Sequence, residues 1–376
     1  MASGMDTPWV EIDLDALLHN LAQIRHRLPA GAGVIGVVKD SAYGCGAPEV
    51  ARALEQAGVP LFAVARTAEA RELRQAGIRT PVLVLGEARP EDLPWIAANG
   101  VHLALNDLAA CRTLGASRLA LPVHVNIDTG MGRLGVRPPE LGELPGALRG
   151  TTLRLAGAFT HFACADEPAH AGVAGQVKQF EECLEALAAA GLRPEFVHCA
   201  NSAGIVNVPW PGGVTHCRPG IMLYGCRPDP WRDPGIDLRP IASLKGHVVK
   251  VKRVAAGTPI SYGWQYRSPA DTIIGTVNTG YGHGLPRFLS RGGVILVGGR
   301  RCQIAGRVTM DYTMVDLGAA STVQPGDEAV AIGHQGGERI TPDEVAAAGD
   351  TIAYEVLCNL GTRIPRVYLR PGTPGR

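Results

Sequence analysis

The chain has 376 residues, 46% of them apolar and 19% charged, and its 36 basic and 35 acidic residues leave a net charge of +1. This length predicts two or three domains with large cores, and the composition excludes a disordered, coiled-coil or low-complexity chain. Because the charges balance and no basic run is present, the sequence gives no electrostatic basis for binding nucleic acid or an anionic membrane.

The sequence has no stretch of the roughly 18 apolar residues that a membrane span needs, and its first seven residues lack the pattern of a signal peptide. We therefore expect a cytoplasmic protein. The nine cysteines are odd in number and form no C-x-x-C pair, so we expect no disulfide framework and no metal site. Only five of the 36 basic residues are lysines, so arginine is the usual surface cation of this chain. A lysine among apolar residues therefore calls for a specific explanation.

Between about residues 30 and 225, short apolar runs alternate with stretches of helical period, which is typical of βα units around a parallel sheet. Eight such units favour a closed (β/α)₈ barrel over an open doubly wound sheet. The predicted strands are Val34–Val38, Leu61–Val64, Pro81–Leu85, Val101–Leu105, Leu119–Ile127, Leu153–His161, Glu195–Ala200 and Val214–Cys217. Predicted helices between them include Pro48–Gln56, Ala68–Ala76, Ala109–Leu114 and Gly175–Ala190.

After Arg227, prolines and glycines between residues 228 and 240 mark a linker, and no long helical pattern follows before Thr341. The chain beyond the linker contains short β-branched runs separated by glycine or proline. The predicted strands are Leu244–Val254, Thr272–Val277, Val294–Val297, Gln303–Val308, Thr313–Leu317 and Glu328–Ile332. The alternating start, Trp9–Leu14, can join them and is followed by a predicted helix over Asp15–His26.

The predicted fold class is therefore α/β, a (β/α)₈ TIM barrel with a second, mostly β C-terminal domain. The barrel is expected to span residues 14–235. The β domain is expected to comprise residues 1–13 and 236–376.

Lys39 is the first candidate for chemistry. It closes the first predicted barrel strand, and the C-terminal ends of the strands form the active-site face of such barrels. A partly desolvated amine in that position has a lowered pKa and can condense with an aldehyde. A solvated lysine at a strand end is the ordinary alternative.

Two further candidates follow the fifth and eighth predicted strands. Arg133 lies in the glycine-rich segment Asp128–Gly135 and offers a planar fork suited to a carboxylate. Arg218 precedes Pro219 and Gly220 in an apolar context, at the strand where barrels often bind phosphate. A surface arginine in a turn and a structural ion pair are the ordinary explanations for these two residues.

Polar residues also follow the sixth and seventh predicted strands. His161 ends the sixth strand, His198 lies near the end of the seventh, and Asn201 and Ser202 follow it. Ser202, near a predicted helix start, is a candidate phosphate ligand. Either histidine alone is as readily a satisfied core residue. In the predicted β domain, Tyr262 lies between a serine and a glycine, a pattern that is common in turns.

Taken together and in order, these motifs resemble the bacterial alanine racemase family, which comprises pyridoxal-phosphate enzymes of fold type III. The resemblance runs from Glu11–Leu14 to Tyr354–Cys358, nearly the whole chain. The segment V-V-K-D-S-A-Y-G-C-G at residues 37–46 is similar to the family motif V-V-K-A-D-A-Y-G-H-G. It implies that Lys39 forms the Schiff base with pyridoxal 5'-phosphate.

The resemblance implies further contacts to the cofactor. In addition to Lys39, the implied cofactor-binding residues are Tyr43, His161, Asn201, Ser202, Arg218, Gly220, Ile221 and Tyr354. Arg218 would hydrogen-bond the pyridine nitrogen, and His198 would hold that arginine. Because arginine keeps its proton, the pyridine nitrogen would stay neutral, which suppresses transamination and decarboxylation. Arg133 and the backbone N–H of Met310 would receive the substrate carboxylate.

Inversion at the α-carbon requires one base on each face of a planar centre. The resemblance implies that Lys39 serves the D-enantiomer and Tyr262 of the partner subunit the L-enantiomer, with His161 beside that tyrosine. The implied assembly is a homodimer with shared active sites. Its implied substrate is a small amino acid, alanine first.

Several positions depart from the family pattern. Asp40, Ser41 and Cys45 replace alanine, aspartate and histidine around the lysine. Asn126 stands where many members have a carbamylated lysine, so we expect a bound anion such as chloride, or plain hydrogen bonding, in its place. Leu285 replaces a tyrosine at the substrate entrance, which leaves serine or broad-specificity racemisation open. The sequence also leaves open a fold III decarboxylase and a non-catalytic paralogue that binds the cofactor.

Overall fold

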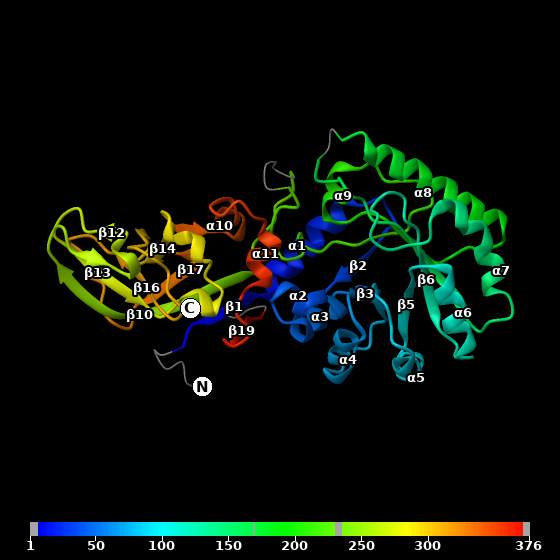
Figure 1. Ribbon diagram of the computed structural model, residues 1–376, viewed down its shortest axis with the longest axis horizontal. Coiled ribbons are helices and arrows are strands. Elements are labelled where there is room, and N and C mark those ends of the chain that lie inside the picture. The colour runs from blue at the N-terminus through cyan, green and yellow to red at the C-terminus, as the bar shows by residue number, and fades with distance from the viewer. Residues whose placement is uncertain (1–6, 168–169, 230–234, 371–376) are drawn as a thin grey trace.

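The computed structural model describes residues 7–167, 170–229 and 235–370. Eight parallel strands close a barrel, with each strand paired to the next and β9 paired back to β2 (Figure 1). The strands are β2 Gly33–Val37, β3 Leu61–Val64, β4 Val82–Val84, β5 Val101–Leu105, β6 Pro122–Asn126, β7 Arg154–Phe159, β8 Phe196–His198 and β9 His216–Cys217. Each overlaps a predicted strand, so the predicted barrel is confirmed.

Helices surround the barrel and, apart from α1, which precedes β2, lie between its strands in the chain (Figure 1). They are α1 Leu14–Arg27, α3 Ala47–Gln56, α4 Thr67–Gln75, α5 Leu93–Ala98, α6 Leu108–Ala116, α7 Leu144–Leu148, α8 Gly172–Ala189 and α9 Ser202–Asn207. In α1, the Asp13 carboxylate accepts the N–H of Ala16 at 2.9 Å, which caps the helix where the alternating start of the chain ends. No helix of the described residues is long and apolar enough to cross a membrane.

A second, mostly β part extends from one side of the barrel (Figure 1). Its nine-stranded sheet comprises β1 Trp9–Asp13, β10 Ala242–Val254, β13 Thr272–Val277, β14 Val294–Val297, β15 Arg300–Gln303, β16 Thr313–Asp316, β17 Glu328–Gln335, β18 Glu338–Ile340 and β19 Arg366–Leu369. A small hairpin, β11 Pro259–Ile260 with β12 Tyr266–Arg267, and the helices α10 Pro342–Ala347 and α11 Ala353–Cys358 complete it. The alternating start of the chain joins this sheet, as expected.

One predicted strand is wrong. The run 303–308 was expected to be extended, whereas β15 covers Arg300–Gln303 and the following chain makes only an isolated bridge at Ile304. Gly298 and Gly299, both at positive φ, turn β14 into β15 and start the pairing earlier than the apolar pattern suggests. The linker predicted over 228–240 includes residues 230–234, which lie outside the described residues.

Lys245 on β10 forms ion pairs with residues on the two neighbouring strands, β1 and β17. Its Nζ lies 2.8 Å from the Glu11 carboxylate on β1 and 3.2 Å from that of Glu328 on β17. Its side chain is only 8% exposed, so this β10 lysine has a structural reason for its apolar surroundings.

The C-terminal strand braces the loop that follows β2. The Arg366 guanidinium on β19 donates to the Gly44 carbonyl at 2.8 Å, and the Tyr368 hydroxyl donates to the Cys45 carbonyl at 3.2 Å. A Cβ atom on Gly46 would lie 1.9 Å from the Tyr368 hydroxyl, so only glycine allows this approach. The two parts of the chain therefore meet directly beneath the predicted Lys39 loop.

Candidate active site

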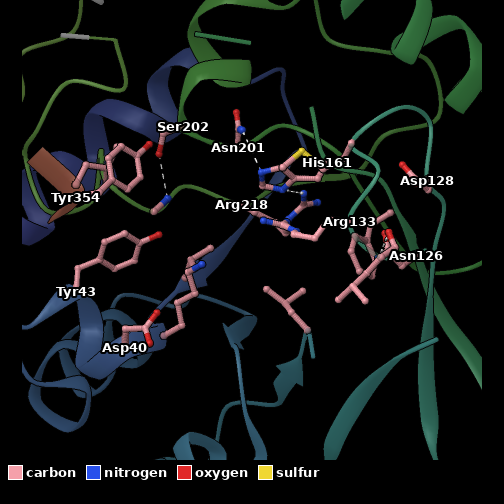
Figure 2. Close-up of a pocket in the computed structure, with 18 of the residues that line it drawn as sticks. Asp40, Tyr43, Asn126, Asp128, Arg133, His161, Asn201, Ser202, Arg218 and Tyr354 are labelled. Carbon is pink, nitrogen blue, oxygen red and sulfur yellow. Dashed lines mark hydrogen bonds between the residues drawn. The ribbon is translucent and has the colours of Figure 1, made fainter. Parts of the chain in front are cut away.

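A cavity of about 340 Å³ opens at the C-terminal ends of the barrel strands. Most of the predicted site residues line it, although they come from different barrel strands and loops and, for Tyr354, from α11 of the β part (Figure 2). These residues are Lys39, Tyr43, Asn126, Arg133, His161, Asn201, Ser202, Arg218, Gly220, Ile221 and Tyr354. His198 lies behind the cavity wall, whereas Tyr262 and Met310 lie in the β part of the chain. The described residues contain no group of three or more histidine, cysteine or acidic side chains that could hold a metal ion.

Lys39 begins an unusual turn. The short helix α2, Lys39–Tyr43, carries four consecutive non-glycine residues at φ between 52° and 55°, from Asp40 to Tyr43. A left-handed turn costs roughly 1–2 kcal/mol per residue because Cβ crowds the following carbonyl oxygen. Strained backbone of this kind persists where the surroundings over-determine it, and it is concentrated at functional sites.

Glu69 is one of the groups that hold this turn, and sequence reasoning missed it. Its side chain is buried at the third position of α4. One carboxylate oxygen accepts the N–H of Asp40 at 2.7 Å, and the other accepts the N–H groups of Ala65 and Arg66 at 2.7 and 2.9 Å. A glutamate at the third helical position that reaches back to the cap was the available signal.

Cys45 is a buried thiol rather than a reactive one. Burial raises the pKa of its thiol to about 12. The thiol therefore stays protonated at neutral pH, which makes it a poor nucleophile.

Arg218 lies at the floor of the cavity, where it is 4% exposed. Its guanidinium donates to Nδ1 of His198 and to the carbonyl of Thr160, both at 2.7 Å, and to the His198 carbonyl at 2.8 Å. No carboxylate of the described residues forms an ion pair with Arg218. The structural ion pair considered as the ordinary explanation for this arginine is therefore absent from the described part of the chain. Burial lowers the pKa of Arg218 to about 10. Because this pKa is still well above neutral pH, the guanidinium stays charged.

His161 touches the same arginine from the cavity side. Its Nδ1 lies 3.3 Å from Nη2 of Arg218, and its Nε2 lies 3.5 Å from the Asn201 amide nitrogen (Figure 2). Burial first, and then the positive charges of Arg218, Arg133 and Lys39, lower the pKa of His161 to about 3. His161 is therefore neutral and can accept a hydrogen bond.

One wall of the cavity presents hydroxyl groups (Figure 2). Ser202 Oγ accepts the N–H of Gly220 at 3.0 Å and that of Met222 at 3.3 Å, which leaves its own hydrogen free to donate. Burial raises the pKa of Tyr43 and of Tyr354, so both phenols stay protonated. Neither hydroxyl makes a hydrogen bond to another described residue.

The opposite wall carries Arg133 and Asn126 (Figure 2). Arg133 is exposed and makes no hydrogen bond or ion pair within the described part of the chain. Asn126 donates to the Asn106 side-chain oxygen at 2.8 Å and to the Leu134 carbonyl at 3.0 Å. Both amide hydrogens are thereby used within the protein, which agrees with plain hydrogen bonding, one of the two expected alternatives.

Tyr262 and Met310 are not brought to this cavity by their own chain. Their side chains are 69% and 55% exposed, and Trp264 and Tyr312 nearby are 65% and 49% exposed. Hydrogen bonds join the loops that carry them, for example from Ser261 Oγ to the Arg307 carbonyl at 2.8 Å. These four exposed side chains lie on the two loops that this hydrogen bond joins, and they are called here the aromatic patch.

Leu285 is also remote from the cavity. It is fully buried in the β part and lines a separate small pocket with Tyr281, Pro286 and Phe288. Within its own chain it does not widen the space around Lys39.

A barrel whose mouth gathers a lysine, a buried arginine and several hydroxyl groups in one cavity, with a β domain attached, defines a two-domain barrel enzyme with its site at the C-terminal ends of the strands. The family model "Alanine racemase, N-terminal domain" matches residues 12–228, and "Alanine racemase, C-terminal domain" matches residues 241–368. The chain therefore belongs to the alanine racemase family, as its motifs predict.

Individual relatives agree along their whole length. The alanine racemases of Desulforamulus reducens and Symbiobacterium thermophilum are each 40% identical, and the alignments cover 96% and 97% of this chain and 98% of each relative. The crystal structure of alanine racemase from Bacillus anthracis with bound L-Ala-P has a TM-score of 0.90 and 38% identity, covering 99% of this chain and 97% of that one.

Proposed function

We propose that the protein is a pyridoxal 5'-phosphate-dependent racemase that interconverts L- and D-alanine. The observation that carries the proposal is the position of Lys39 in one cavity with Arg218 and the hydroxyl wall. Membership of the alanine racemase family supports the same reaction. When bound, the cofactor supplies an aldehyde to the lysine amine and a conjugated ring that delocalises the charge left by removal of the α-proton.

The donors present fit such a group. Ser202, Tyr43 and Tyr354 offer three neutral hydroxyl donors, which suit a phosphate group. Arg218 is a donor that cannot become an acceptor, which suits an unprotonated ring nitrogen. We propose that the backbone of Gly220 and Ile221, with Asn201 and His161, completes the binding site.

Two residues, an amine and a phenol, would move the reacting proton on opposite faces of the substrate. We propose that Lys39 removes or returns it on one face of the substrate α-carbon, and that Tyr262 of the partner subunit does so on the other. Arg133, which has no protein partner in the described structure, would orient the substrate carboxylate together with the Met310 backbone N–H of the partner subunit.

A homodimer is part of this proposal. Tyr262 is exposed and outside the cavity of its own chain, so the second base has to come from another copy. Exposed apolar patches mark protein interfaces, and a two-fold axis would place each aromatic patch over the other chain's cavity. We also propose that the enzyme works in the cytoplasm, since all nine cysteines are unpaired, as in a reducing compartment.

The decisive experiment follows the loss of optical rotation from L-alanine by the cofactor-loaded dimer, with serine, lysine and arginine as competing substrates. Alanine should be racemised fastest, without release of carbon dioxide. Carbon dioxide release would replace the proposal with a decarboxylase, faster turnover of serine would replace it with a serine racemase, and cofactor binding without turnover would leave a binding protein.

A further inference from the structure

Three histidines form a hydrogen-bonded chain through the interior of the barrel. Nδ1 of His102 lies 2.9 Å from Nε2 of His124, and Nδ1 of His124 lies 3.0 Å from Nε2 of His198. His198 in turn meets Arg218 at 2.7 Å. The chain runs from near the start of β5, across β6, to the end of β8 beneath the cavity. Only its last members, Arg218 and His198, belong to the site described above.

A glycine makes the chain possible. β7 lies between β6 and β8, and Gly157 is the β7 residue paired with both His124 and Phe196. A Cβ atom on Gly157 would fall 2.1 Å from Nδ1 of His124, in the space that the ring occupies. Without a side chain at this position, the His124 ring reaches across β7 to His198.

Arg218 sets the direction of every hydrogen bond in the chain. A guanidinium only donates, so Nδ1 of His198 must be the acceptor and its Nε2 must carry the hydrogen. That hydrogen is donated to Nδ1 of His124, whose Nε2 then donates to Nδ1 of His102. All three rings are therefore neutral with the hydrogen on Nε2, because adjacent rings share a single hydrogen.

The surroundings agree with neutral rings. Arg218 stands at one end of the chain, and Arg154 and Arg74 approach His102 at the other, while His216 faces the middle. The rings of Phe159 and Phe196 stack on His198 and His124. Burial lowers the pKa of all three chain histidines, and the arginine charges lower it further.

We propose that His124 and His102 are positioning residues that act through His198 to hold the charged guanidinium of Arg218 at the floor of the cavity. A buried cation with no carboxylate partner needs other acceptors, and aligned hydrogen bonds polarise one another. The chain points the acceptor nitrogen of each ring toward Arg218. The consequence for cofactor and catalysis rests on the proposed function, because it assumes that Arg218 donates to the cofactor ring.

The chain can be measured by NMR on the cofactor-loaded enzyme carrying ¹⁵N-labelled histidine. The expected result is an unprotonated Nδ1 and a protonated Nε2 for each of the three residues. A protonated Nδ1 at His198 or His124 would overturn the proposal without the need for any variant.

Two substitutions at one position then separate hydrogen bonding from packing. His124→Asn keeps an acceptor oxygen near the place of Nδ1, whereas His124→Phe keeps an aromatic ring but removes the acceptor. The Phe variant should shift the His198 Nδ1 resonance and the visible spectrum of the bound cofactor, and it should lower kcat roughly five- to tenfold with KM nearly unchanged. The Asn variant should restore most of each signal.

His216→Phe is the matched control, because this barrel histidine bonds to Thr215 Oγ1 at 2.7 Å and lies outside the chain. Should His124→Phe not fold, Gly157→Ala displaces the same ring by a single methyl group. Unchanged His198 and cofactor signals in a variant that has lost the chain would overturn the proposal. A loaded wild-type enzyme with the expected tautomers but no racemisation would instead refute the proposed function and leave the histidine chain standing.

Discussion

A Cβ atom on Gly220 would fall 2.3 Å from the hydroxyl oxygen of Tyr43. The two residues follow β9 and β2, the strands whose pairing closes the barrel. The phenol therefore lies against bare backbone, at a place where both can face a phosphate group. This contact makes the hydroxyl wall of the cavity sensitive to a single methyl group.

Gly220→Ala should weaken cofactor binding while leaving the fold intact, because the methyl group would displace the Tyr43 hydroxyl. We expect the Kd for pyridoxal phosphate to rise about tenfold, the equivalent of one hydrogen bond. Gly175→Ala in α8 is the control, since no atom of the described residues lies within 4 Å of its added Cβ. Equal Kd values for the two variants would remove Gly220 from the proposed cofactor site.

Lys39→Ala should abolish the visible absorbance of bound cofactor and lower racemisation by at least about a thousandfold, because it removes both the attachment point and one base. Lys178→Ala, on an α8 lysine whose side chain is 79% exposed, should behave as wild type. A Lys39→Ala enzyme with normal turnover would disprove the lysine assignment.

The shared active site predicts complementation. Tyr262→Phe and Lys39→Ala homodimers should each be inactive in racemisation. After subunit exchange, a mixed dimer has one cavity with both bases, so about a quarter of wild-type activity should return in a random mixture. If Tyr262 served its own chain, every cavity would lack a base and mixing would restore nothing.

Arg133→Leu should raise KM for alanine roughly ten- to hundredfold, the range for a lost charge-assisted hydrogen bond. The melting temperature should hardly change, because Arg133 is exposed and has no protein partner among the described residues. Arg137→Leu, which removes an exposed arginine paired with Glu140, serves as the control. Two variants with the same KM would show that Arg133 does not bind the carboxylate.

Acid should destabilise the protein through its buried histidines. The pKa of His102 is lowered to about 4 and that of His161 to about 3, while unfolded histidine titrates near 6.5. Below about pH 6.5 these histidines are protonated in the unfolded chain but stay neutral in the folded chain, so a lower pH favours unfolding. Each such histidine should cost about 1.4 kcal/mol of unfolding free energy per pH unit as the pH falls from about 6 toward 4. Urea unfolding over this range measures the effect, and a flat profile would contradict it.

Much of the architecture could be predicted because its signals are local. Apolar runs of strand length, helical period and glycine or proline breaks lie within a few residues of one another, so they mark all eight barrel strands. Local pattern misplaced β15, because a glycine turn and partner strands set its register. The division of the chain at residues 13/14 and 235/236 stays a prediction.

Part of the candidate site could likewise be predicted from the sequence, and part of it depends on the tertiary structure. The sequence shows which residues follow each predicted strand, including Lys39 and Arg218. Because closure of a barrel gathers the C-terminal ends of all strands at one face, these residues could be predicted to lie together. The sequence marks Glu69 only as a possible helix-capping residue, and it could not show that this carboxylate also binds the N–H of Asp40. Nor could it show that Asn126 donates both amide hydrogens within the protein, or that Gly157 lets His124 reach His198. Those contacts join atoms far apart along the chain, and they exist only once the closed barrel fixes strand register and ring orientation.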